Sequence, residues 1–307
     1  MTRKLPGNAV DRLAAEHEVD VWEGELPPSP EELLGRARYA EGLLCLLTDR
    51  IDAALLDDCP SLRAISNMAV GTDNIDLEEA ARLEIPVGNT PGVLTETTAD
   101  LAFALILACA RRLVEAAGAV RAGEWRTWEP AGWLGYDVHG ATLGIVGAGK
   151  IGRAVARRAE GFGMNLLLNG RGPASWRVSL DQVLAESDFV SLHAPLSSET
   201  HHLIGEDELR AMKPTAMLIN TGRGELVDPV ALRRALEQGW IAGAGLDVTE
   251  PEPVEVNDPL LGAPNLTVLP HIGSASHATR GAMADLAVDN LLAALAGRPM
   301  PNPVGPA

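Results

Sequence analysis

The sequence has no apolar run long enough to cross a membrane. Its most hydrophobic stretch, Leu101 to Cys109, stops at Arg111 and Arg112, so it predicts a buried helix and not a membrane span. The first six residues lack the apolar core of a secretory signal. These absences predict a cytoplasmic protein that has no membrane partner.

Cysteine is scarce. Cys45, Cys59 and Cys109 lie far apart, with no CxxC pair and no His–Cys spacing of the kind that binds metal. We expect them to be small core residues in a reducing compartment. The sequence therefore predicts no metal site.

Positive charge is also in short supply. The chain carries 25 Lys and Arg against 42 Asp and Glu, a formal net charge of −17. This balance argues against nucleic acid or an anionic membrane surface as a partner. If the ligand is an anion, a well-placed arginine must overcome the unfavourable overall field.

What remains is the composition of a globular protein. With 307 residues, 46% of them hydrophobic, the chain has room for two domains that each bury a core. Short apolar runs alternate with helical stretches from Gly42 onward, which is typical of parallel α/β architecture. The predicted strands are 42–47, 62–66, 85–88, 142–146, 165–168, 189–193, 216–219, 242–246 and 266–269.

Three further segments have distinct patterns. Residues 99–120 are apolar on nearly every turn and give the strongest helix prediction. Residues 123–140 are rich in Trp and irregular, and a long irregular segment is usually functional or part of an interface. The Pro-rich tail from Pro299 is expected to fray.

A glycine-rich motif follows the predicted strand 142–146. Gly147-Ala-Gly149-Lys-Ile-Gly152 leads into a helical run at 153–161. In this setting the glycines permit a tight turn, close approach of the backbone to a pyrophosphate, and close packing of helix on strand. The N–H groups at the start of the helix bind the phosphates. The motif predicts a dinucleotide site.

The position that selects between NAD and NADP holds no acid. In NAD-specific sites a carboxylate about 20 residues after the motif binds the ribose 2′-hydroxyl. Here Asn169 stands at that position and Arg171 follows. An arginine can pair with a 2′-phosphate, so the sequence favours NADP(H). NAD(H) stays possible if Arg171 is only a surface charge.

Polar residues follow three predicted strands in the second half of the chain. Arg223 follows strand 216–219, Asp247 and Glu252 follow strand 242–246, and His271 follows strand 266–269. Because ligands of open α/β sheets bind at the carboxyl ends of the strands, these side chains are candidates for one crevice. A histidine can protonate an alkoxide, a carboxylate can orient it, and an arginine can bind a substrate carboxylate through two hydrogen bonds.

Several ordered motifs together resemble the D-isomer-specific 2-hydroxyacid dehydrogenases over essentially the whole chain. They are residues 70–76, 98–101, 147–152, 220–224, 245–253 and 270–274. Within that family, segments 43–49, 245–249 and 271–276 are most similar to glyoxylate/hydroxypyruvate reductases. The resemblance implies NADPH-dependent reduction of a small 2-oxo acid, glyoxylate or hydroxypyruvate, to glycolate or D-glycerate.

The resemblance also implies roles for individual residues. His271 is the acid/base, Glu252 is its partner and Arg223 is the substrate anchor. The expected substrate site comprises Leu47, Val70, Gly71, Trp133, Arg223 and Ser274, with the main-chain amides of Val70 and Gly71 holding the substrate carboxylate. The expected cofactor site comprises Thr98, Gly147, Gly149, Lys150, Ile151, Gly152, Asn169, Arg171, Pro195, Thr221, Asp247 and Gly273.

Two assignments outside the triad are less specific. Asp247 has two interpretations: it orients Arg223 and the cofactor side, or it only caps the following turn. The histidines other than His271, including His193, His201 and His202, are expected to be structural or exposed.

The fold class that the resemblance implies is α/β, with two doubly wound parallel-sheet domains. A Rossmann nucleotide domain, residues 96–279, is inserted into a flavodoxin-like substrate domain, residues 1–95 plus 280–307. A homodimer is also implied, with residues 99–120 and 123–140 at its interface and Trp133 reaching the partner's pocket. Family members begin with a short strand ahead of the segment that resembles residues 2–6, and that strand is absent from this sequence. We therefore expect either that this sequence begins late relative to the family or that its first domain has one strand fewer.

Two alternatives stay open. One is a phosphoglycerate or broad-specificity D-2-hydroxyacid dehydrogenase. The other is an NAD(H)-sensing corepressor, similar to the C-terminal-binding proteins, which share the fold and the triad. A corepressor predicts extra interaction tails, of which the sequence has almost none, and a turnover assay separates the two classes.

Overall fold

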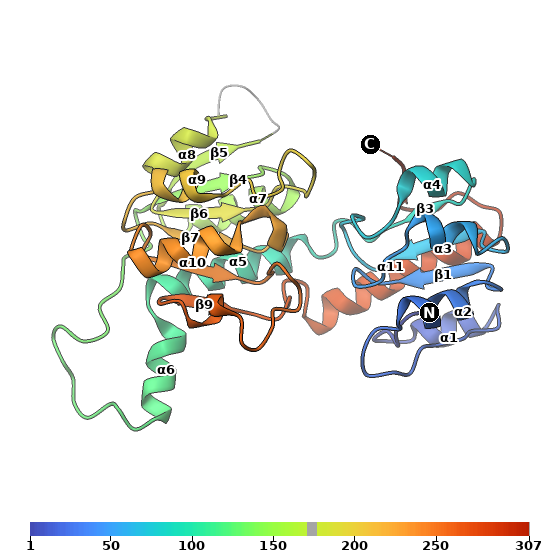
Figure 1. The fold of residues 1–307 in the computed structure, drawn as a ribbon, viewed down its shortest axis with the longest axis horizontal. Helices are drawn as coiled ribbons and strands as arrows, with labels where there is room; N and C mark the ends of the chain where they lie inside the picture. Colours follow the sequence, from blue (N-terminus) through green and yellow to red (C-terminus); the bar gives the residue numbers. More distant parts are fainter. Residues whose placement is uncertain (171–176, 307) are drawn as a thin grey trace. The chain divides into compact units, whose positions relative to one another are not determined.

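The computed structural model describes residues 1–170 and 177–306, and the chain divides into two compact units. Unit 1 comprises Met1–Leu94 and Ala275–Ala307, and unit 2 comprises Thr95–Ser274. Each unit has its own sheet and helices (Figure 1). No helix in the described part of the chain is long and apolar enough to cross a membrane.

Unit 2 is built on a six-stranded parallel sheet in the order β5-β4-β6-β7-β8-β9. The strands are β4 (Thr142–Val146), β5 (Asn165–Asn169), β6 (Phe189–Leu192), β7 (Met217–Asn220), β8 (Gly243–Leu246) and β9 (Leu266–Val268). The chain leaves β4 toward β5 on one side and continues from β6 on the other. The carboxyl ends of β4 and β6 therefore flank the topological switch point, where such sheets bind ligands.

Helices cover both faces of this sheet. Alternate residues of one strand point to opposite faces, and Leu218 packs in one core while Met217 and Ile219 pack in the other. The first core includes α8 (Leu180–Glu186), α9 (Glu206–Ala211) and α10 (Pro229–Gln238); the second includes α5 (Thr95–Ala110) and α7 (Lys150–Glu160). Burial on both faces explains why these strands read as nearly continuous apolar runs.

Unit 1 has a four-stranded sheet in the order β1-β2-β3-β10. Strands β1 (Gly42–Cys45), β2 (Ala64–Asn67) and β3 (Val87–Gly88) are parallel, and β10 (Pro303–Val304) is antiparallel to β3. The helices are α1 (Ala9–Ala14), α2 (Pro30–Ala37), α3 (Ala53–Asp57), α4 (Leu77–Arg82) and α11 (His277–Leu295). Side chains of Ser29, Asp52 and Asp76 cap α2, α3 and α4, as N-cap residues do.

The structure corrects two of the sequence predictions. The helix predicted at 99–120 is two helices, α5 and α6 (Leu113–Arg121), because Arg112 adopts a left-handed φ of 53° that no α-helix accommodates. The tail from Pro299 does not fray. It forms β10, and the side-chain oxygen of Asn290 accepts a hydrogen bond from the N–H of Asn302 at 2.9 Å.

Candidate active site

The glycine loop after β4 lies against the end of β6. A Cβ at Gly147, which has a φ of +96°, would lie 2.4 Å from the carbonyl carbon of His193. A Cβ at Gly152 would lie 2.3 Å from the carbonyl oxygen of Gly147. Both positions therefore need glycine, the first for the turn and the second for the close packing of α7 on β4.

The start of α7 has the properties of a phosphate site. The first backbone hydrogen bond of this helix runs from the N–H of Arg153 to the carbonyl of Gly149, so the N–H groups of Lys150, Ile151 and Gly152 precede the helical ladder. A Cβ at Gly149 would meet nothing within 4 Å. Open space beside free N–H groups at a helix N-terminus fits the pyrophosphate of a dinucleotide.

Asn169, the last residue of β5, is fixed beside this loop. Its carbonyl oxygen accepts hydrogen bonds from the N–H groups of Gly147 and Ala148, at 2.9 and 3.0 Å. Its side-chain amide donates to the carbonyl of Val178 at 3.0 Å, which leaves the amide oxygen facing no described donor. Arg171, the other residue expected to select the cofactor, lies outside the described residues.

The remaining expected cofactor residues follow neighbouring strands. Thr221 follows β7, and its hydroxyl is buried with no hydrogen-bond partner among the described residues. Gly273 lies beside buried Thr98 of α5, since its Cβ would lie 3.4 Å from that side chain. Pro195 is exposed after β6. The unsatisfied hydroxyl and the phosphate-type helix start together fit a nicotinamide dinucleotide.

Asp247, directly after β8, holds the turn that carries His271. Its side chain is buried, and its two carboxylate oxygens accept hydrogen bonds from the N–H groups of Ile272 and Gly273, at 2.8 and 2.7 Å. Its carbonyl accepts from the N–H of His271 at 2.9 Å. Burial raises the pKa of Asp247, against the effect of the two amide donors. The carboxylate and the backbone carbonyl of Asp247 together therefore hold the turn at three consecutive residues.

His271 and Glu252 form a direct pair. Nδ1 of His271 lies 2.6 Å from Oε1 of Glu252, and the two side chains are 24% and 34% exposed. One ring nitrogen thus contacts a carboxylate, while Nε2 is left for another partner. His271 has a left-handed φ of 52°, a conformation that costs energy in a non-glycine residue and is common at functional sites.

Arg223 begins the short 3₁₀ helix Gly224–Leu226 after β7 and is half-buried. Its carbonyl accepts a hydrogen bond from the side-chain amide of Asn220 at 2.7 Å. A Cβ at the next residue, Gly224, would lie 2.0 Å from the carbonyl oxygen of Thr249. The loop after β7 therefore contacts the loop that carries Glu252 through backbone atoms, a contact that sequence reasoning did not identify.

The substrate residues expected in unit 1 follow β1 and β2. Leu47 is half-buried after β1, and Val70 and Gly71 lie in the loop after β2. The carbonyls of Val70 and Gly71 accept hydrogen bonds from the side chains of Asn89 and Asn67. Among the described residues, no acceptor is found for the N–H groups of Val70 and Gly71, as an anion-binding loop requires.

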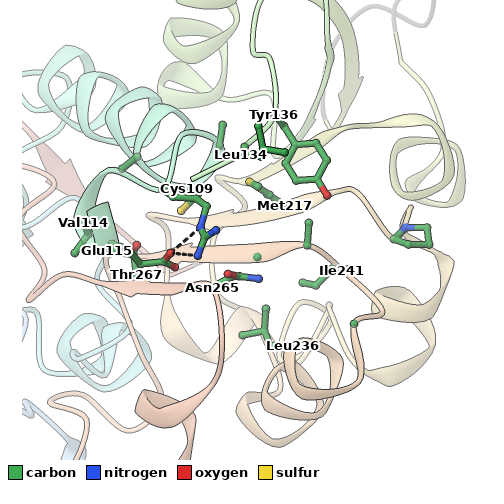
Figure 2. Close-up of a pocket in the computed structure, with 18 residues that line it drawn as sticks. Cys109, Val114, Glu115, Leu134, Tyr136, Met217, Leu236, Ile241, Asn265 and Thr267 are labelled. Atoms are coloured by element: carbon green, nitrogen blue, oxygen red, sulfur yellow. Dashed lines mark hydrogen bonds and ion pairs between the residues drawn. The ribbon is translucent and has the colours of Figure 1, made fainter. Parts of the chain in front are cut away.

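The structure places Trp133 at the other end of the sheet in unit 2 from His271. The guanidinium carbon of Arg112 lies over the ring of Trp133, 5.3 Å from the centroid of that ring. Arg112 in turn pairs with Glu115 at 2.7 Å and lines a cavity of about 290 Å³ (Figure 2). The cavity is bordered by Met217, Gly243 and Asn265, at or next to the first residues of β7, β8 and β9. We assign no substrate to it, because the polar residues of the site follow the opposite, carboxyl ends of these strands.

The structure gives the surroundings of three histidines that the sequence predicts to be structural or exposed. His193 contacts the Ser191 hydroxyl through Nε2 at 2.8 Å, and burial lowers its pKa to about 4. His201 and His202 face Glu250 together. The sequence signal for this cluster was the pair of consecutive histidines, which sequence reasoning treated as structural or exposed.

Comparisons with known proteins show which family the chain resembles. Residues 103–273 match the NAD-binding domain of D-isomer specific 2-hydroxyacid dehydrogenases. The chain is 51% identical to a glyoxylate reductase of Korarchaeum cryptofilum, over 98% of this chain and 94% of that protein. It matches the crystal structure of the TT0316 protein from Thermus thermophilus with a TM-score of 0.94 and 50% identity, covering 99% and 98% of the two chains. It matches an NADPH-dependent glyoxylate/hydroxypyruvate reductase of Sinorhizobium meliloti, solved with NADP and malonate, with a TM-score of 0.86 and 36% identity, covering 98% and 94%.

Proposed function

The chain belongs to the D-isomer-specific 2-hydroxyacid dehydrogenase family, and we propose that it reduces glyoxylate and hydroxypyruvate to glycolate and D-glycerate with NADPH. Membership of this family makes it an NAD(P)-dependent oxidoreductase that acts on small 2-oxo acids of the glyoxylate type. The proposal concerns the particular substrates, the preferred cofactor and the residues that carry out the chemistry.

The pair of His271 and Glu252 is the observation that carries the proposal. When bound, the reduced nicotinamide supplies the hydride for the 2-carbon of the substrate. Nε2 of His271 donates the proton that the carbonyl oxygen needs, since Nδ1 is 2.6 Å from Glu252 and the pair of carboxylate and imidazolium is electrostatically favourable. Asp247 keeps the ring in place by holding the backbone of the turn.

Substrate binding is assigned to groups that suit a carboxylate. Arg223 offers a planar guanidinium that can bind the substrate carboxylate through two hydrogen bonds and polarise the carbonyl. The N–H groups of Val70 and Gly71 and the hydroxyl of Ser274 complete the proposed anion site. Leu47 and the partner subunit's Trp133 would restrict the space for the side chain, so two- and three-carbon acids are favoured.

NADP(H) is the proposed preferred cofactor. The strand β5 ends in Asn169 and not in an acid, so nothing at that position repels a 2′-phosphate. Arg171 is the proposed partner of this phosphate, and exposed Arg177 adds long-range attraction.

A homodimer is proposed from the exposed apolar surface of unit 2. Leu113 and Val114 of α6 are 54% and 56% exposed, and Trp125 and Trp128 of the following irregular segment are 68% and 79% exposed. Such a concentration of exposed apolar side chains marks an interaction site. Light scattering should give twice the 32.4 kDa chain mass.

Turnover of variants tests the proposed roles. His271→Ala and Arg223→Ala should each lower kcat/KM for glyoxylate by at least about a thousandfold, a range typical for loss of an acid/base or a charge-binding group. NADPH affinity, measured by fluorescence titration, should stay within about threefold of wild type. Glu252→Gln should cause a smaller loss of kcat/KM than either alanine variant. His277→Gln is the matched control, because His277 is an exposed histidine outside the proposed site. Full activity of His271→Ala would exclude the proposed proton donor.

A further inference from the structure

We propose that His201, His202 and Glu250 form a binding site for one divalent ion of the zinc class. All three residues belong to unit 2 and lie apart from the residues assigned to hydride transfer. His201 and His202 are in the turn that precedes Ile204, and Glu250 is in the loop after β8. The site does not depend on the proposed function.

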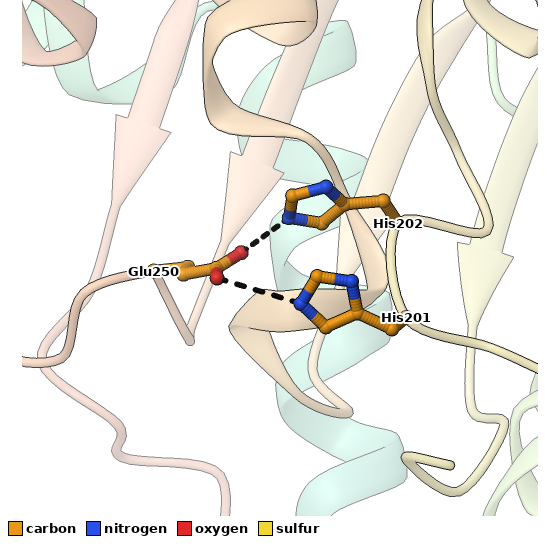
Figure 3. Close-up of side chains that lie close together, drawn as sticks. All are labelled: His201, His202 and Glu250. Carbon is orange, nitrogen blue, oxygen red and sulfur yellow. Dashed lines mark hydrogen bonds and ion pairs between the residues drawn. The ribbon is translucent and has the colours of Figure 1, made fainter. Parts of the chain in front are cut away.

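The ligand atoms converge on a common point. Nε2 of His202 lies 2.7 Å from one carboxylate oxygen of Glu250, and Nε2 of His201 lies 3.7 Å from the other (Figure 3). One ligand atom from each residue lies within 4.8 Å of the others. A tetrahedral ion at metal–ligand distances near 2.0–2.2 Å separates its ligands by about 3.3 Å. The two His–Glu separations fall on both sides of this value and involve different oxygens of Glu250, so the side chains must rotate for one ion to bind all three residues.

The backbone explains how two consecutive side chains face one ligand. Neighbouring residues of an extended chain point to opposite sides, yet these two imidazoles stack with centroids 4.0 Å apart. His202 has a left-handed φ of 50°, and its N–H donates to the carbonyl of Glu225 at 2.7 Å. The fixed turn thus presents both rings together, and a strained backbone of this kind is common at functional positions.

A purely structural role accounts for only part of the arrangement. The contact with His202 is enough to hold the Glu250 side chain in place. It does not explain why the imidazole of His201 lies at the same carboxylate. Two imidazole nitrogens and a carboxylate oxygen suit Zn²⁺, Co²⁺, Ni²⁺ or Cu²⁺ better than Mg²⁺ or Ca²⁺, which prefer oxygen ligands. The side chains are 51%, 36% and 30% exposed, so water can complete the coordination shell.

Such an ion would link the turn that precedes Ile204 to the loop after β8. Glu250 lies two residues before Glu252, the partner of His271, and the turn of His202 is joined by hydrogen bonds to the segment after Arg223. We therefore assign the ion a role in holding the loop after β8, with no part in the chemical step.

Metal titration of the full chain tests this site. Tag-free protein, stripped with EDTA, is titrated with zinc sulfate by calorimetry and with Co²⁺ by visible absorption. We expect one ion per chain, an intense Co²⁺ absorption typical of low coordination number, and a rise in melting temperature with zinc. His201→Gln and Glu250→Gln should each weaken binding by at least about tenfold. His139→Gln, which changes an exposed histidine elsewhere, should leave it unchanged.

His201→Gln is the decisive variant, because the His201 side chain is half-exposed and its backbone, unlike that of His202, does not have a left-handed φ. Circular dichroism and the melting temperature without metal establish that the variant folds. The proposal is overturned if wild type binds no zinc below about 1 mM. It is equally overturned if folded His201→Gln binds zinc as tightly as wild type, since the ion would then be adventitious.

Discussion

Asp247 shows how a single buried carboxylate can position a site. It lies directly after β8, and its backbone and side chain together accept hydrogen bonds from three consecutive N–H groups, those of His271, Ile272 and Gly273. A carboxylate is a strong acceptor for backbone N–H groups, which offsets the cost of burying it. The sequence left open whether Asp247 orients Arg223 and the cofactor side or only caps the following turn, and the observed hydrogen bonds run instead to the turn after β9.

At the same residue scale, the cofactor choice can be reversed. An arginine–phosphate pair contributes about 1.5–3 kcal/mol, or roughly ten- to a hundredfold in preference. We expect wild type to have a lower KM for NADPH than for NADH. Asn169→Asp combined with Arg171→Ala should reverse that order with little effect on kcat, because the acid binds the ribose diol and repels a 2′-phosphate.

Steady-state kinetics with both cofactors measures this reversal. Arg298→Ala serves as the control, since Arg298 is an exposed arginine of unit 1 with no part in the proposed cofactor site; it should change either KM by no more than about twofold. If unmodified enzyme used NADH as well as NADPH, Arg171 would be only a surface charge.

His193 gives a prediction about stability and pH. Burial lowers its pKa to about 4 from an ordinary value of 6.5, so the folded state binds fewer protons than the unfolded chain between these values. Stability from this group is therefore complete above pH 6.5 and is lost as pH falls toward 4. The loss amounts to about 2–3 kcal/mol near pH 4.5.

Urea unfolding of wild type and His193→Gln near pH 7 and near pH 4.5 checks the sign. Gln retains a polar group that can contact the Ser191 hydroxyl but does not titrate. The variant should lose less stability than wild type over this range. Parallel losses in the two proteins would mean that His193 is protonated at no cost in the folded state.

At the scale of elements, the contact between α7 and β4 determines the geometry of the proposed phosphate site. Gly152→Ala would place a Cβ 2.3 Å from the carbonyl oxygen of Gly147 and 2.9 Å from the side chain of Ile145. We expect α7 to move away from β4, with a cost of about 1–3 kcal/mol and a KM for the cofactor at least about tenfold higher.

Gly281→Ala is the matched control for that substitution. Gly281 is also a helical glycine, in α11, but a Cβ there would meet nothing within 4 Å. It should stabilise the protein by roughly 0.5–1 kcal/mol through helix propensity. Unchanged thermal unfolding and cofactor KM in Gly152→Ala would show that the contact is not required.

Elements that bury apolar residues on both faces could be predicted from the sequence, and elements held by a few polar contacts could not. All nine predicted strands are present, and the fold class is confirmed by the structure and by the family. The break at Arg112 depends on one left-handed residue, and β10 depends on hydrogen bonds of Asn290 and Asn302. Neither leaves a periodic signal in the sequence.

The site shows the same division. Arg223 and His271 each lie three residues after a strand, so both could be proposed from the sequence, because a parallel sheet places all its carboxyl ends at one edge. The contact of Gly224 with Thr249 and the cluster around Glu250 join loops from different strands. Such contacts depend on loop conformations that residue spacing does not determine.

At the scale of the whole molecule, β1 is an edge strand of the sheet in unit 1. A groove of about 580 Å³ lies beside β1, with Leu13, Trp22, Leu43, Leu44, Leu291 and Leu295 among its lining residues. The N–H of Thr2 donates to the carbonyl of Leu44 at 3.1 Å, and the carbonyl of Met1 accepts from the N–H of Trp22 at 3.0 Å. Residues 1 and 2 thus lie as the last residues of a strand would lie between β1 and the segment around Trp22. Burial also lowers the pKa of the Met1 ammonium group.

An apolar strand joined to Met1 should therefore fill this groove and stabilise the protein. We expect the extension Lys-Val-Val-Ile-Val to pair with β1, to cover Leu43 and Leu44, and to move the terminal charge out of the groove. For a net gain of about 2 kcal/mol the melting temperature should rise by about 4–8 °C. The control extension Lys-Val-Pro-Ile-Val has the same length but cannot form the strand hydrogen bonds at its centre, so its melting temperature should stay near that of the unextended chain. Equal melting temperatures for the two extensions would mean that the groove does not accept a strand, and that a single exposed edge at β1 costs the sheet little.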